Sequence, residues 1–270
     1  IVDAVCELTK ACARITPSCS CAMKAAYDKE SSENAKFALE MLIENAKIAE
    51  ERQLPVCQDT GMSVVFIKLG QDVHITGGLL DDAVNEGVRR GYLLNGYRAS
   101  VLDPITRVNT RDNTPAVTHI SLVAGDRLEI AFLPKGFGSE NMSRLYMLTP
   151  SDGIDGVKKS ILDAVKLAGT KPCPPMVVGV GIGGTADKAM VLAKEQLLRE
   201  IGAPSEDSTL AELERELLKD INALGIGAQG FGGETTALAI HIGKFPTHIA
   251  ALPVAVNIQC NAVRLSRVTL

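Results

Sequence analysis

A short apolar run, a glycine-rich turn and a helix-forming segment follow one another directly near the middle of this chain. The run "VVGVGIGG" (177–184) leads into "TADKAMVLAKEQLLREI" (185–201), where apolar residues recur at helical spacing. Gly179, Gly181 and Gly184 match the spacing of the glycines that bind dinucleotides between a strand and a helix. This arrangement favours a fold that mixes strands with helices.

The dinucleotide interpretation meets an obstacle further along the chain. The motif expects an acidic residue about 20 positions later at the end of a second strand. That region here is "IGAPSED" (201–207), a polar loop between two predicted helices. A nucleotide-binding module therefore stays only as an alternative. We expect instead a close backbone approach beside Cys173, with a helix N-terminus directed at an anion.

A second glycine-rich segment, "GIGAQGFGG" (225–233), allows two interpretations. Its glycines can bring main-chain N–H groups close to a ligand, with Gln229 offering a side-chain amide. It can equally be a plain flexible loop, and the segment alone does not decide between them.

Helical and strand-like segments are mixed without regular alternation over the rest of the chain. The pattern predicts strands at 63–69, 117–123, 127–133 and 247–258, and helices at 32–53, 79–91, 153–168, 185–201 and 208–223. The segment "AGDR" (124–127) predicts a hairpin turn between two of the strands. No repeat or low-complexity linker marks a boundary. We therefore predict an α/β (α+β) fold with a mixed sheet flanked by helices, as one domain over 1–270 that allows for two joined lobes.

Charge, hydropathy and cysteine usage exclude several classes of partner. A net charge of −4 over 270 residues argues against nucleic acid. No apolar run approaches the roughly 18 residues of a membrane helix. The seven cysteines are an odd number without an export signal, so we expect a reducing cytoplasm.

Three of the seven cysteines stand apart from the others in similar surroundings. Cys57 lies in "PVCQDTG", Cys173 in "KPCPPM" and Cys260 in "NIQCNAVR", each close to an apolar run. If the fold brings these thiolates together, they leave one coordination position of a metal open, as in catalytic sites. Soft thiolates favour zinc or an iron–sulfur cluster. Spacing alone favours three unrelated buried thiols, and a structural zinc protein is a further alternative.

The other four cysteines, Cys6, Cys12, Cys19 and Cys21, lie in the first 21 residues. The spacing in "CSC" is too tight for the common zinc pattern, and we interpret these thiols as incidental.

Six longer blocks surround and connect the three isolated cysteines. They are "PVCQDTGMSVVFIKLG", "NTRDNTPAVTHI", "LPKGFGSENMSRLYMLTPSDG", "CPPMVVGVGIGGTADKAMVLAKEQLL", "LGIGAQGFGGETTALAIHI" and "LPVAVNIQCNAVR". In this order they closely resemble the α subunit, or N-terminal half, of the class I, iron–sulfur-dependent fumarate hydratases. The resemblance runs from about residue 30 to the end of the chain.

The resemblance implies a function and a set of site residues. It implies a hydro-lyase that interconverts fumarate and (S)-malate with a [4Fe-4S] cluster, whose open iron acts as a Lewis acid. The cluster ligands would be Cys57, Cys173 and Cys260. Asp59 and His248 would move protons. A dicarboxylate also needs cations or amide donors, for which the candidates are Gln58, Arg98 and the main-chain N–H of Gly138. Asp59 is a further candidate for contact with the substrate.

The chain departs from the family pattern at two positions. Phe137 stands at a usual glycine in "KGFGSEN", and Asn261 stands where a histidine often follows the third cysteine. The related L-tartrate dehydratase α subunits share the "CQDTG" and "CPP" blocks, so they remain an alternative. The resemblance also implies that further substrate-binding residues belong to a β subunit. We expect this chain to need that subunit and to form a homodimer.

Overall fold

The computed structural model describes residues 1–270, and the chain divides into two compact units. Unit 1 consists of Ile1–Thr16, Asn45–Phe137 and Arg264–Leu270, and unit 2 of Pro17–Glu44 and Gly138–Val263. The chain passes from unit 2 to unit 1 within one helix, α3 (Glu33–Arg52). Mixed sheets flanked by helices confirm the predicted α/β class. A single folding domain stays a prediction.

Unit 1 is built on a four-stranded sheet with the order β2-β1-β3-β8. The strands are β1 (Met62–Gly70), β2 (Val117–Val123), β3 (Leu128–Lys135) and β8 (Ser266–Thr269). Helices α1 (Val2–Leu8) and α4 (Leu80–Leu94), with the short helix η1 (Thr9–Ala13), pack on one another and on this sheet. Their shared core includes Val5, Val65, Val88, Tyr92 and Phe132.

The predicted hairpin between β2 and β3 is wrong, although both strands exist. β1 lies between them and pairs in parallel with β2 and antiparallel with β3. The connecting turn closes over the end of β1, where the N–H groups of Gly70 and Gln71 donate to the carbonyls of Arg127 and Val123. β1 carries a nearly continuous buried run. Such a strand gains most from a central position with neighbours on both edges.

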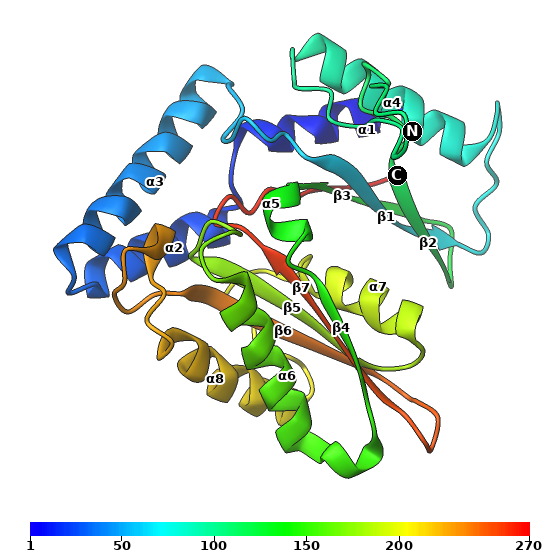
Figure 1. Cartoon of the computed structure of the whole chain (residues 1–270). Helices are drawn as coiled ribbons and strands as arrows, with labels where there is room; N and C mark the ends of the chain where they lie inside the picture. The colour runs from blue at the N-terminus through cyan, green and yellow to red at the C-terminus, as the bar shows by residue number, and fades with distance from the viewer. The chain divides into compact units, whose positions relative to one another are not determined.

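Unit 2 is built on a second four-stranded sheet with the order β4-β7-β5-β6. The strands are β4 (Arg144–Leu148), β5 (Met176–Gly183), β6 (Ala237–Phe245) and β7 (Leu252–Gln259). Helices α6 (Gly153–Ala168) and α8 (Ser208–Asn222) cover one face, while α7 (Ala186–Gln196) covers the other (Figure 1). Helix α2 (Pro17–Lys29) and the short segments α5 (Phe137–Glu140), η2 (Pro150–Asp152) and η3 (Ala228–Gly230) complete the elements.

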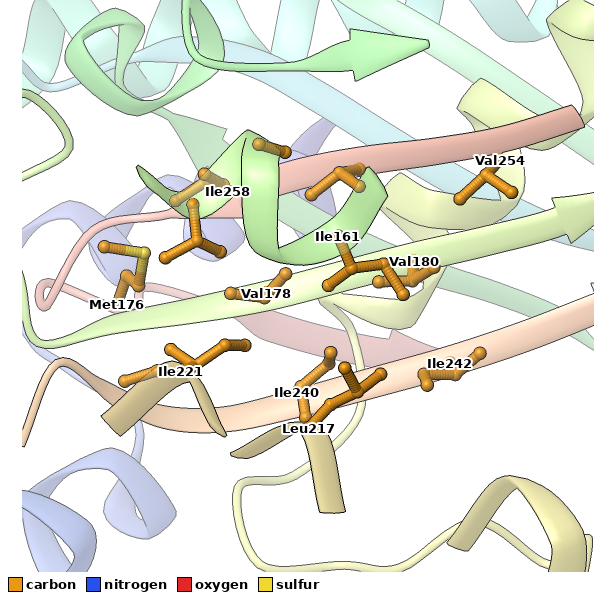
Figure 2. Packing of buried hydrophobic residues seen from close by; sticks show 14 of the residues in the cluster. Ile161, Met176, Val178, Val180, Leu217, Ile221, Ile240, Ile242, Val254 and Ile258 are labelled. Atoms are coloured by element: carbon orange, nitrogen blue, oxygen red, sulfur yellow. The ribbon is translucent and has the colours of Figure 1, made fainter. Parts of the chain in front are cut away.

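The main core of unit 2 lies between the sheet and the two helices on its first face. Figure 2 shows Ile161 of α6 close to Val178 and Val180 of β5, and Leu217 and Ile221 of α8 close to Ile240 of β6, all in one cluster. These apolar side chains recur every three or four positions on the helices and every second position on the strand, as burial of a single face requires. The Asp207 side chain caps α8 by accepting from the N–H groups at 209 and 210.

The glycines of "GVGIGG" allow close packing of α7 on β5. A Cβ atom at Gly179 would lie 2.2 Å from the carbonyl oxygen of Ala193, and one at Gly181 would lie 2.2 Å from that of Ala189. A side chain at either position would therefore push the helix off the strand. This accounts for both glycines without a nucleotide.

Most predicted helices end within a few residues of their observed limits. α6 has the predicted bounds, and α8 ends one residue early. α7 stops at Gln196, five residues short, because the next N–H groups bond three residues back and tighten the last turn. β7 begins five residues late, after a turn in which the N–H of Ala251 donates to the carbonyl of His248.

The chain has no helix with the length and hydropathy needed to cross a membrane.

The buried ring of His241 in β6 predicts an acid sensitivity of unit 2. Burial, followed by the nearby Arg199 guanidinium, lowers the pKa of His241 to about 4, against the opposing influence of Glu214. Between the unfolded pKa near 6.5 and pH 4 the unfolded chain binds a proton that the folded chain excludes. Stability is therefore complete above the unfolded pKa and is lost as the pH falls. We expect a loss of about 2 kcal/mol from pH 7 to pH 5.

Urea unfolding of the wild type and His241→Gln at several pH values measures this effect. His241→Gln should lose most of the decrease in the free energy of unfolding between pH 7 and pH 5 that the wild type shows, even if the variant is less stable at pH 7. His74→Gln, which changes an exposed imidazole, should keep the wild-type pH dependence. An equal dependence in the wild type and His241→Gln would contradict the assignment.

Candidate metal and substrate site

The loop that joins α3 to β1 carries the first group of predicted site residues. Cys57 and Gln58 are exposed and Asp59 is half-buried. The loop is tied to unit 1 because the N–H of Val56 donates to the carbonyl of Cys12 (3.0 Å). The N–H of Asp59 points at Cys57 Sγ (3.4 Å). An exposed thiol thus lies beside a carboxylate on an anchored loop.

The Asp59 carboxylate is held by main-chain donors on both oxygens. Oδ1 accepts from the N–H of Gly61 (3.0 Å), which is an Asx turn, and Oδ2 accepts from the N–H of Phe137 (2.8 Å). The second bond ties the carboxylate to the "KGFGSEN" segment at Phe137, the residue that replaces the usual glycine of the family. Both bonds keep the carboxylate in one orientation.

Two arginines of unit 1 flank this loop in different ways. Arg98 is exposed, and its carbonyl accepts from Thr60 Oγ1 (2.9 Å), so its main chain lies next to the loop. Arg264 is only 1% exposed and donates from Nη1 to the Asp59 carbonyl (2.9 Å). Its Nε has no hydrogen-bond partner. Arg264 therefore supports the Asp59 main chain from inside the unit.

Cys173 and Cys260 lie at one end of the sheet of unit 2. Cys173 is exposed and lies just before β5, separated from it by two prolines, while Cys260 is half-buried and directly follows β7. The two strands are antiparallel neighbours with Val177 opposite Gln259, which places both cysteines at the same end. The side chain of Gln259 points a donor at Cys260 Sγ (3.8 Å).

Gly138 lies near the same end of unit 2. A Cβ atom built on it would lie 3.4 Å from the carbonyl oxygen of Lys171, two residues before Cys173. Unit 2 therefore brings Gly138, Cys173 and Cys260 together, whereas unit 1 brings Cys57, Gln58, Asp59 and Arg98 together.

His248 lies at the opposite end of the same sheet. It precedes β7, whereas Cys260 follows it, and the eight residues of this strand span about 23 Å. The neighbouring Thr247 donates to the carbonyl of Gly184, beyond the far end of β5 (2.8 Å). Within one chain, His248 therefore cannot share a site with Cys173 and Cys260.

The structure of unit 2 corrects the expected direction of the α7 N-terminus and shows what the Gln229 amide contacts. The N-terminus of α7 follows β5, whereas Cys173 precedes it, so the helix does not point at an anion beside Cys173. Its first turn is already supplied with the carboxylate of Asp187, whose pKa is lowered by the Thr185 hydroxyl and then by main-chain N–H groups. The amide of Gln229 donates to the carbonyl of Pro174 (2.7 Å), so it serves the chain itself.

Two of the four thiols near the N-terminus, Cys12 and Cys19, are buried, whereas none of the three isolated cysteines is. Burial raises the pKa of Cys19 to about 12 and also raises the pKa of Cys12. Their sulfurs donate to the carbonyls of Asn261 (3.2 Å) and Thr60 (3.5 Å), respectively. Cys6 is half-buried and Cys21 is exposed. Cys12 and Cys19 are therefore packing residues, as expected for incidental thiols.

The three candidate ligands are divided between the units. Cys57 belongs to unit 1, and Cys173 and Cys260 belong to unit 2. No three His, Cys, Asp or Glu side chains in the structure are grouped closely enough to hold a metal ion. Convergence of the three sulfurs therefore stays a prediction.

These observations define an α/β protein in which one accessible thiol, Cys57, lies next to a fixed carboxylate, a combination suited to metal-assisted chemistry. A match to the family described as fumarate hydratase (Fumerase) spans residues 2–269. The chain belongs to this family of hydro-lyases.

Curated relatives extend the match over nearly the whole chain. The chain is 46% identical to the putative L(+)-tartrate dehydratase subunit alpha of Methanocaldococcus jannaschii, covering 98% of this chain and 95% of that protein. It is 33% identical to the L(+)-tartrate dehydratase subunit alpha of Escherichia coli O157:H7, covering 90% and 81%. It is 34% identical to the anaerobic class I fumarate hydratase of Escherichia coli K12, covering 88% of this chain and 45% of that enzyme.

Proposed function

We propose that this chain is the cluster-binding α subunit of a hydro-lyase that interconverts fumarate and (S)-malate. The observation that carries the proposal is the anchored "CQDTG" loop, which presents Cys57 beside Gln58 and the oriented carboxylate of Asp59. Family membership supports the reaction class. The preference for fumarate over tartrate rests on the "GFGGETTAL" and "NIQC" blocks, which resemble the fumarate hydratases and which the L-tartrate dehydratase α subunits tend to lose.

The donor set fits a [4Fe-4S] cluster with one iron free of protein ligands. Cys57 and Cys173 are exposed and Cys260 is half-buried, so all three sulfurs can reach a ligand. N–H groups near the sulfurs of Cys57 and Cys260 suit thiolates. When bound, the cluster would supply a Lewis-acidic iron for the hydroxyl and carboxylate of the substrate. The ligands would have to come from both units.

The other site residues would bind the dicarboxylate and move protons. Arg98 and the amide of Gln58 can hold substrate carboxylates by charge-assisted hydrogen bonds, with the N–H of Gly138 as a further donor. Asp59 can accept or return a proton, because its carboxylate is oriented beside the loop thiol. His248 could serve the site only if a second copy of the chain supplied it, consistent with the expected homodimer.

Dehydration of L-tartrate is the second candidate. Two of the relatives described above carry the name of L(+)-tartrate dehydratase subunit alpha, and one of them covers nearly the whole chain. The same ligand and carboxylate set would suit this substrate, which has one more hydroxyl than malate. The names of these relatives also support a β subunit as a partner of this chain.

Seven free cysteines suit a reducing cytoplasm as the compartment of this protein.

One assay tests the function and separates the two substrates. The chain is combined with its β subunit and reconstituted anaerobically with iron and sulfide. (S)-Malate, fumarate and L-tartrate are then supplied separately, with products followed by NMR. We expect malate and fumarate to interconvert at least tenfold faster than tartrate is dehydrated. A reversed order would favour the tartrate reaction, and no turnover of any of the three would contradict the proposal.

A further inference from the structure

The main chain at Cys173 adopts a conformation that other residues must hold. Cys173 has φ +54°, in the left-handed region that side chains other than glycine rarely occupy. Its N–H donates to the carbonyl of Thr170 (3.0 Å). Such a conformation costs free energy and persists only where surrounding contacts impose it. Those contacts come from two segments distant in sequence.

Asn261 supplies the first contact. Its side-chain Nδ2 (2.7 Å) and its main-chain N–H (3.2 Å) both donate to the carbonyl of Cys173. Asn261 directly follows Cys260 in the chain, so its bonds to Cys173 connect the main chain at one candidate ligand to the main chain at the other. The carbonyl of Asn261 in turn accepts from the buried Cys19 thiol (3.2 Å). The Cys19 bond therefore holds the Asn261 main chain in place, and Asn261 in turn holds the carbonyl of Cys173.

Gln229 supplies the second contact. Its main-chain N–H (2.8 Å) and its side-chain Nε2 (2.7 Å) both donate to the carbonyl of Pro174, the next residue along the chain. Gln229 itself has φ +52°. Its loop is anchored where the N–H of Glu234 donates to the buried carboxylate of Glu30 (2.9 Å).

We propose that Asn261 and Gln229 are positioning residues that fix the direction of the Cys173 sulfur toward its ligand. The consecutive carbonyls of Cys173 and Pro174 each accept two N–H groups, those of Cys173 from Asn261 and those of Pro174 from Gln229. All four bonds end on main-chain oxygens, so they constrain where the thiol lies and leave its chemistry unchanged. The ligand would be the iron–sulfur cluster, and this identity rests on the proposed function.

The substitutions Asn261→Asp and Gln229→Glu test the inference with little change in volume. Each replaces a donor with an oxygen that repels the carbonyl it faces. Matched controls are Asn95→Asp and Gln53→Glu. The side chain of Asn95 donates to the carbonyl of Gly91 (2.7 Å), and that of Gln53, which has φ +53°, donates to the carbonyl of Glu50 (2.7 Å). Asn261→His, which keeps a ring N–H, is the conservative variant.

The first measurement is hydrogen exchange of the chain without a cluster. We expect the amide hydrogens of Cys173 and Gln229 to exchange about tenfold faster in Asn261→Asp and Gln229→Glu than in the wild type. The controls should leave these amides unchanged, and Asn261→His should restore protection. Unchanged exchange in both test variants would overturn the inference.

The second measurement is the rate at which a ferrous chelator removes iron from the reconstituted two-subunit enzyme. We expect about tenfold faster loss in the two test variants than in the controls. Equal rates, with a normally loaded wild type, would overturn the inference. If the wild type takes up no iron, the proposed function fails instead, and the exchange measurement still decides whether these residues hold Cys173.

Discussion

Replacing Cys57, Cys173 or Cys260 with serine, one at a time, is expected to abolish hydration of fumarate. A serine hydroxyl is a much poorer ligand for iron than a thiolate, so the cluster would lose one of three protein anchors. We expect activity to fall at least about a thousandfold, or about 4 kcal/mol. Bound iron after anaerobic reconstitution should fall in parallel, measured by colorimetric iron analysis and absorbance.

Cys21→Ser is the matched control for these substitutions. Cys21 is exposed, as are Cys57 and Cys173, but it lies in α2 outside the six blocks that carry the family resemblance. Its activity and iron content should match the wild type. Cys12 and Cys19 are unsuitable controls, because both are fully buried and their replacement can lower stability. Full activity in Cys57→Ser, Cys173→Ser or Cys260→Ser would refute its assignment as a ligand.

The isolated chain is expected to be essentially inactive and to gain turnover when the β subunit is added. The candidate residues provide one exposed cation, Arg98, for a substrate with two carboxylates. The remaining donors, Gln58 and Gly138, are neutral. A second carboxylate without a cationic partner binds weakly in a water-filled site. We expect a gain of at least a hundredfold in the rate of fumarate hydration, measured anaerobically at saturating substrate.

The same titration yields the stoichiometry of the complex. Activity should rise linearly with added β subunit and level off at one β subunit per chain. Addition of an unrelated soluble protein at the same concentration serves as the control. Purified chain alone, free of any partner, that hydrates fumarate at roughly 10 per second or more would show that the chain carries a complete site.

The sequence was most informative where local physical chemistry decides the outcome. The helix over 153–168 has the predicted limits, because its apolar residues recur at helical spacing and it ends at a glycine. The "CQDTG" block alone drew attention to Cys57 and Asp59, and the structure places them on one anchored loop. The family membership implied by the six blocks is confirmed by a match over residues 2–269.

The sequence could not show which strands pair or what the glycines and amides contact. The "AGDR" turn looks like a hairpin, yet β1 lies between its two strands, because a long buried strand competes successfully for both neighbours. Gln229 was interpreted as a possible ligand-binding amide from its glycine-rich segment, and His248 as a catalytic residue from the family resemblance. In the structure, Gln229 holds the peptide after Cys173, and His248 lies at the far end of β7.

The sequence by itself therefore determined the family of the chain, its main helices, and a loop that places a thiol beside a carboxylate. Those features depend on residue type and on spacing over a few positions. Only the tertiary structure decided the strand order, the packing role of Gly179 and Gly181, and the contacts of Asn261 and Gln229 with the Cys173 segment. These depend on which distant segments pack best against each other, a competition that no local pattern records.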